Sequence, residues 1–148
     1  MKRIIVIAFI ALIAAACTQQ NKETTDYKAV RDDVMKFHDV VMGDHSVLVG
    51  NQMKLDTLLR QLGGLKTKFP DVDTLKEKEV IAAMLKDLSK AEDEMNDWMH
   101  KFEPDVTGKS NEVAVQYFKD ERKKIEEIDS LYKLEIKLSD EYLNKFKK

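Results

Sequence analysis

The most constraining feature of the sequence is a seven-residue repeat of apolar side chains over residues 27–62. Apolar residues spaced alternately three and four apart line one face of an α-helix, and that face packs against other helices. The apolar positions of the repeat are Tyr27, Val30, Val34, Phe37, Val41, Leu48, Leu55, Leu58 and Leu62. Asp44 and Asn51 interrupt it. The repeat predicts one long helix that ends at Gly63 and Gly64.

A second helix is expected after the connecting segment that follows these glycines. Thr74 and Glu77 have the spacing of a capping box, in which each side chain bonds the other residue's backbone N–H at a helix start. Pro104 and Gly108 are expected to end this helix. Its apolar face comprises Met84, Leu88, Ala91, Met95, Trp98 and Phe102.

A third helix is predicted over residues 111–146, with Ser110 as its N-terminal cap. Its broad apolar face comprises Phe118, Ile125, Ile128, Leu131, Tyr132, Leu138, Tyr142 and Phe146. Acid-to-base pairs four residues apart are expected to support its exposed face. These pairs are Asp120 with Lys124, Asp129 with Lys133, and Glu141 with Lys145.

Three long helices joined by two short connections predict an all-α, up-down-up bundle over residues 27–148. The chain has only five glycines and two prolines, and 35% of its residues are charged, which is typical of long exposed helices. Glycine inside a helix costs about 1 kcal/mol relative to alanine. A break near Gly43–Gly50, giving four segments, is therefore the alternative.

The first 17 residues, MKRIIVIAFIALIAAAC, have the pattern of a secretory signal. Lys2 and Arg3 precede an uninterrupted apolar run over residues 4–16. As a helix this run would reach about 20 Å, which is short of the hydrocarbon layer of about 30 Å. Cleavage is therefore a better interpretation than a permanent membrane span.

The sequence AAAC at the end of this segment resembles the lipobox of bacterial lipoproteins, although Ala14 stands where the motif usually has leucine. The resemblance implies a lipoprotein signal peptide over residues 1–16 and a lipidated Cys17. The residues that follow, TQQNKETTD, are polar and without periodicity, so residues 17–26 are expected to be the lipidated cysteine and a short polar tether. Cys17 is the only cysteine, so no disulfide within the chain is possible. By resemblance to Gram-negative lipoprotein sorting, Thr18 in place of aspartate implies the outer membrane, facing the periplasm.

The charge of the mature chain excludes a nucleic-acid-binding role. Cleavage would remove Lys2 and Arg3, leaving 23 basic against 27 acidic residues, a formal net charge of −4. Binding to nucleic acid depends on a basic surface, and here the lysines are interleaved with acidic residues. The same mixture offers no basic cluster for anionic lipid. Membrane attachment is therefore expected through the lipid on Cys17 alone.

A stripe of methionine and histidine residues in MKFHDVVMGDH raises the question of a metal site. Thioethers and imidazoles suit copper, and a Met–His pair can ligate haem. The candidate ligands are Met35, His38, Met42, His45, Met95, Met99 and His100. Packing between helices also explains the stripe, since methionine fills irregular gaps and histidine buries its apolar edge. We expect no cofactor, with copper or haem as the alternative.

Four polar residues fall on or near the predicted apolar faces: Asp44, Asn51, Glu121 and Glu135. Polar residues on a bundle seam commonly set the register between helices. The sequence contains no nucleophile with a neighbouring base and no glycine-rich phosphate loop. We therefore expect a non-enzymatic protein.

Two short motifs, HDVVM at residues 38–42 and DWMHKF at residues 97–102, resemble a family of small Gram-negative lipoproteins often labelled viral A-type inclusion protein. The matching residues are His38, Asp39, Met42, Trp98, Met99 and His100. The family label reflects coiled-coil similarity and implies no known activity. We therefore expect a structural or protein-interaction role at the cell envelope, with an envelope protein or a second copy of the chain as partner.

Overall fold

A computed structural model describes residues 25–147, so the predicted signal peptide, Cys17 and most of the tether lie outside the described residues. It contains three long helices and one short helix. Their bounds are α1 Tyr27–Arg60, α2 Leu62–Lys68, α3 Thr74–Lys101 and α4 Asn111–Asn144. The predicted all-α bundle is confirmed.

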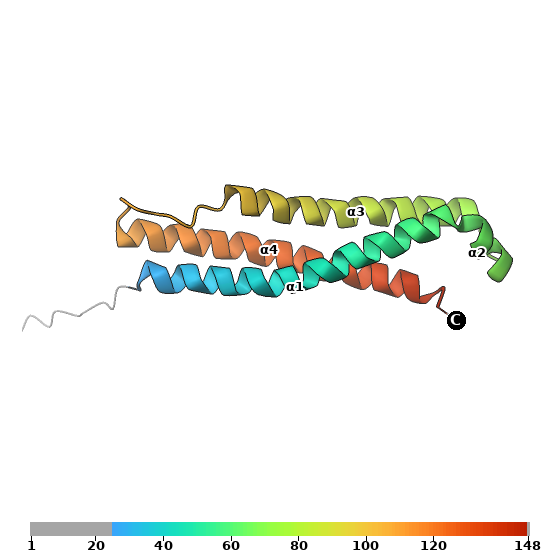
Figure 1. The fold of residues 1–148 in the computed structure, drawn as a ribbon, viewed down its shortest axis with the longest axis horizontal. Coiled ribbons are helices and arrows are strands. Elements are labelled where there is room, and N and C mark those ends of the chain that lie inside the picture. The colour runs from blue at the N-terminus through green and yellow to red at the C-terminus, as the bar shows by residue number, and fades with distance from the viewer. Residues whose placement is uncertain (1–24, 148) are drawn as a thin grey trace, which may run out of the picture.

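The long helices lie side by side along the long axis of the molecule. The short helix α2 lies at the end of the bundle opposite the start of α1 (Figure 1). Residues near the start of α1 contact the start of α4, and residues later in α1 contact later residues of α4. Tyr27 is hydrogen-bonded to Asn111, and Asn51 to Ser139. These two helices are therefore parallel, and α3 runs antiparallel to both. This is the predicted up-down-up arrangement.

The core follows the seven-residue repeat closely. Val34, Val41, Leu48 and Leu55 are fully buried, and each is seven residues from the next. On α3 and α4 the fully buried positions are Ile81, Leu88, Ala91, Met95, Phe118, Ile125 and Tyr132. Burying such side chains contributes about 1.5–3 kcal/mol each, which makes the repeat the main stabilising feature of the fold.

The expected alternative of a break near Gly43–Gly50 is wrong, because α1 is continuous through both glycines. Neither glycine has a positive φ. Leu48 and Asn51, which both lie within two residues of Gly50, are fully buried in the bundle. The packing of these side chains outweighs the cost of about 1 kcal/mol per glycine.

The predicted end of the first helix is wrong in detail. The helix α1 ends at Arg60, and Gly63 and Gly64 lie within α2 instead of terminating α1. The interruption occurs at Gln61, whose φ of −109° and ψ of 24° depart from helical values. Burial of Leu65 in the bundle stabilises the short helix despite its glycines.

The start of α3 also differs from the expected capping box of Thr74 and Glu77. Asp73 is the cap, and its carboxylate accepts hydrogen bonds from the backbone N–H groups of Leu75 and Lys76. The Glu77 carboxylate instead accepts a hydrogen bond from the hydroxyl of Tyr142 on α4. A contact with another helix has replaced the local one. The predicted cap Ser110 is confirmed at the start of α4.

One of the three predicted ion pairs on α4 forms as expected, between Asp129 and Lys133 at 2.6 Å. The other two are wrong. Lys124 pairs with Glu121 instead of Asp120, and Glu141 pairs with Lys137 instead of Lys145. The Glu121 side chain is only 6% exposed, so a buried carboxylate gains more from the lysine than exposed Asp120 would.

Replacing Gly43 or Gly50 by alanine is expected to raise the free energy of unfolding by about 0.5–1 kcal/mol each. A Cβ atom at either position would meet no other atom within 4 Å, so the helix gains propensity without a clash. Urea denaturation followed by circular dichroism measures the change. Gly108→Ala is the control and should destabilise, because Gly108 has a φ of 86°. A loss of stability in Gly43→Ala would contradict the prediction.

None of the helices within residues 25–147 combines the length and apolar character needed to cross a membrane.

Candidate functional site

The two short motifs of the sequence meet in the structure. The imidazole of His38 on α1 stacks against the indole of Trp98 on α3, with ring centroids 5.9 Å apart. The Nδ1 atom of His38 lies 3.2 Å from the Asp39 carboxylate. Residues 60 positions apart in the chain therefore form one contact at the α1–α3 seam.

An aromatic cluster surrounds this contact at the end of the bundle where α1 begins. Phe102 stacks on Trp98 with centroids 4.8 Å apart and lies 6.1 Å from Phe118. Phe118 in turn contacts Tyr117 and Tyr27, at 5.1 Å and 6.3 Å. The cluster joins all three long helices, because its rings come from α1, from α4, and from α3 with the residue that follows it.

His45, the second histidine of the stripe, contacts a different helix. Its Nδ1 atom lies 3.0 Å from the hydroxyl of Tyr132 on α4, and the two rings stack. Burial, with a smaller effect from Glu92, raises the pKa of Tyr132 to about 12. Burial also raises the pKa of Tyr142, and the carboxylate of Glu77 adds to the effect.

Stability is expected to fall as the pH rises from about 10 to about 12. The phenol of Tyr132 ionises near pH 10 in the unfolded chain and near pH 12 in the folded protein. Between these values the unfolded state binds fewer protons, so unfolding becomes more favourable as the pH rises. Urea midpoints measured across this range should fall less steeply in a Tyr132→Phe variant. An unchanged slope in that variant would contradict the assignment.

The other candidate metal ligands lie in different environments. Met95 is fully buried, and Met42 packs against the core from a partly buried position. Met35 and Met99 are more than a third exposed. His100 lies on the surface, with its Nδ1 atom 2.6 Å from the carbonyl oxygen of Asn96. Within residues 25–147, no group of three histidine, cysteine or acidic residues is placed to hold a metal ion.

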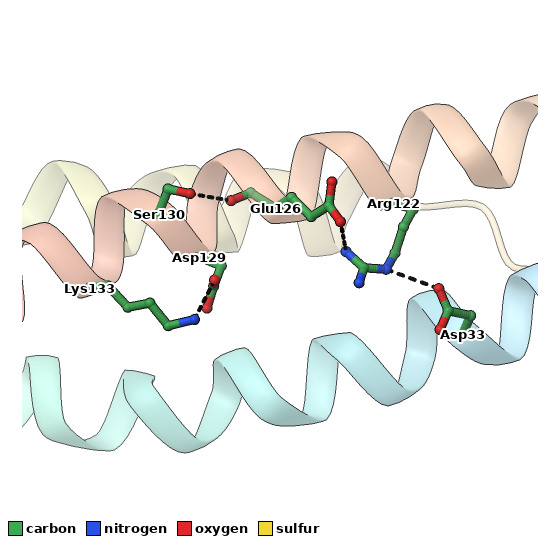
Figure 2. Close-up of polar contacts among 6 residues, drawn as sticks. All are labelled: Asp33, Arg122, Glu126, Asp129, Ser130 and Lys133. Atoms are coloured by element: carbon green, nitrogen blue, oxygen red, sulfur yellow. Dashed lines mark hydrogen bonds and ion pairs between the residues drawn. The ribbon is translucent and has the colours of Figure 1, made fainter.

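A polar seam that the sequence did not predict joins α1 to α4 (Figure 2). Arg122 on α4 bonds the Asp33 carboxylate through Nε at 3.0 Å, and its Nη1 atom lies 2.7 Å from Glu126. The same guanidinium lies 3.6 Å from the centre of the Phe37 ring. The pattern of charges in the sequence shows pairs within a helix. The contact between Arg122 and Asp33, which are 89 residues apart in the chain, depends instead on how α1 and α4 align.

Asn51, one of the polar residues predicted on an apolar face, makes a fully paired contact between α1 and α4. It is completely buried, and its amide nitrogen donates to Ser139 Oγ at 3.0 Å and to Asp140 Oδ1 at 2.9 Å. Its amide oxygen accepts from Lys54 Nζ at 3.0 Å. Such a contact is satisfied at a single axial alignment of the helices, so it sets their register.

Of the other three polar residues, Glu121 is buried, and Asp44 and Glu135 are half-buried. Glu121 is paired with Lys124. Burial, with a smaller effect from Asp87, raises the pKa of Glu135.

A groove of about 470 Å³ lies between α3 and α4. Its apolar floor is formed by Trp98, Ile128 and Leu131, and charged side chains stand on both rims. The indole N–H of Trp98 is buried and has no hydrogen-bond partner within residues 25–147. The sequence placed Trp98 in the core and in the DWMHKF motif but did not predict this groove, because nothing in the local pattern indicates which face of α4 lies opposite Trp98.

No family model matches the chain, and no curated protein or solved structure matches it either.

Proposed function

We propose that the chain is a non-enzymatic lipoprotein of the Gram-negative cell envelope, in which a helical bundle held by lipid on Cys17 acts as a protein-interaction module. The observation that carries the proposal is the first 17 residues. Two basic residues precede a run of 13 apolar residues, whose last three are small alanines, and the only cysteine of the chain follows directly. This order is that of a secretory signal, and its last four residues resemble the lipobox of bacterial lipoproteins. Several acyl chains on one residue form a stable anchor.

The contacts at the start of the bundle support a role for this segment as a tether. Asn111 on α4 accepts a hydrogen bond from the backbone N–H of Tyr27 and donates one to the carbonyl oxygen of Thr25. The chain that leads from Cys17 is thus held at one end of the bundle. Because α4 has 34 residues, its other end lies about 50 Å further along. The anchored bundle would present its side walls and its far end to partners in the periplasm.

The contacts of the buried polar residues support a structural role for them. Asn51 and Ser139 bond each other across two helices, and Glu121 pairs with a lysine. These residues serve packing and register.

A Cys17→Ser variant tests the anchor. We expect wild-type cells grown with an alkyne-tagged palmitate to yield labelled protein in the membrane fraction, and Cys17→Ser to yield none. Intact mass of the wild-type product should show that residues 1–16 have been removed and acyl chains added. Retention of residues 1–16, or an unmodified thiol in the wild type, would overturn the proposal.

A Thr18→Asp variant is the matched control, because it keeps the sulfur atom. It should remain labelled and move from the outer to the inner membrane fraction. An unchanged distribution would contradict the outer-membrane assignment while leaving lipid attachment intact.

A further inference from the structure

The groove between α3 and α4 differs from the rest of the surface in its charges. On its rims, Lys101 pairs with Asp97, and Lys124 pairs with Glu121. Glu94 on α3 and Glu127 on α4 are exposed and have no ion pair or hydrogen bond within residues 25–147. The lysines of the groove are therefore already neutralised, while two carboxylates on opposite rims are not.

The two halves of the bundle also differ in net charge. The half of the bundle near the tether, residues 25–43 and 88–127, has 10 basic and 15 acidic residues. The other half, residues 44–87 and 128–147, has 11 of each. All of the net negative charge of the described residues thus belongs to the half that holds most of the groove. A second copy of this chain would bring like charges together at this place.

The apolar floor continues beyond the groove along α4. Leu131 and Leu138 are seven residues apart and so lie on one line of the helix, with Leu134 beside them. Leu134 is 50% exposed and Leu138 is 42% exposed. One heptad of helix is about 10 Å long, so this row offers apolar surface to about two turns of another helix.

We propose that the α3–α4 groove binds a cationic amphipathic helix of a partner protein. Apolar side chains of the partner pack on Trp98, Ile128 and Leu131, and its lysine or arginine residues pair with Glu94 and Glu127. The inference rests on the proposed interaction role, for which it names the class of partner.

Trp98 is the only tryptophan of the chain, so its fluorescence reports on this groove directly. The probe is an 18-residue amphipathic peptide of leucine and lysine without aromatic residues, and its counterpart carries glutamate in place of lysine. Titrating the purified full chain with the lysine peptide should shift the Trp98 emission to saturation. The glutamate peptide should produce no saturable shift.

Two double variants test the site. Glu94→Gln with Glu127→Gln should weaken binding of the lysine peptide about tenfold. The matched control, Glu103→Gln with Glu112→Gln, removes the same charge from the same half outside the groove and should change binding less than twofold. Circular dichroism confirms that both variants are folded. Equal weakening in both would overturn the proposal, because it would show attraction to overall charge only.

Two other results would also overturn it: an absence of saturable change with the lysine peptide, or a saturable shift of Trp98 by vesicles of anionic phospholipid alone. The peptide titrations need neither a membrane nor a lipid attached to the protein. A failure of lipid attachment at Cys17 would therefore leave their outcome unchanged, and the two proposals fail separately.

Discussion

Replacing Phe118 by alanine is expected to lower the free energy of unfolding by about 4 kcal/mol. The side chain is completely buried on α4 and contacts the rings of Tyr27, Phe102 and Tyr117. Its removal takes away apolar burial and leaves a cavity where the three long helices meet. Since domains of this size are stable by about 5–15 kcal/mol in total, the change is a large fraction of the whole.

The control for this prediction is Leu134→Ala on the same helix. Leu134 is 50% exposed, so its loss should cost less than about 0.5 kcal/mol. Urea denaturation followed by far-ultraviolet circular dichroism compares the two variants. The near-ultraviolet spectrum should also weaken in Phe118→Ala, because the aromatic cluster loses its central ring. Similar losses of stability in both variants would show that Phe118 is not buried as described.

Replacing Asn51 by aspartate is expected to cost about 3–5 kcal/mol at neutral pH. The amide nitrogen of Asn51 donates to Ser139 and to the Asp140 carboxylate. A carboxylate at the same place has no proton to donate, and it would set two negative charges against each other in a buried position. The pair with Lys54 would recover only part of this loss.

The pH dependence distinguishes this explanation from a packing defect. Protonation of the new carboxyl restores a donor and removes the repulsion, so the cost should shrink as the pH falls towards 4. Asn144→Asp makes the same chemical change at an exposed position of α4 and should cost less than about 0.5 kcal/mol. Asn51→Leu, which removes the polar group entirely, should cost less than Asn51→Asp at pH 7. A pH-independent loss in Asn51→Asp would contradict the role assigned to the pair of Asn51 and Asp140.

Much of the fold could be predicted because helix formation and burial follow local rules. The repeat of Val34, Val41, Leu48 and Leu55 identified the buried face of α1 correctly. Ser110 was identified as a cap because a capping hydrogen bond spans only three residues.

Local rules failed where a contact from another helix competed with them. Glu77 has the spacing of a capping box, but its carboxylate accepts from Tyr142 on α4. Gly63 and Gly64 would end an isolated helix, but burial of Leu65 keeps the chain helical around them. In each case the energy of a tertiary contact is as large as the local preference, and the sequence pattern does not reveal it.

At the candidate site, too, the sequence identified individual residues but not the contacts between them. The sequence identified His38 and Trp98 as members of two separate motifs, but not that their rings stack. The sequence did not identify Arg122, Glu94 or Glu127 as site residues, because each is one of many charged residues on a helix surface.

The sequence by itself determined that the chain forms long helices, which faces of them are buried, and how they follow one another up, down and up. These properties come from periodicity and from interactions within a few residues. Only the tertiary structure decided which side chains meet: Asn51 with Ser139, Arg122 with Asp33, and α3 with α4 around a groove. Those contacts depend on the rotation and axial alignment of whole helices, which the sum of all their packing energies sets together and no short segment specifies alone.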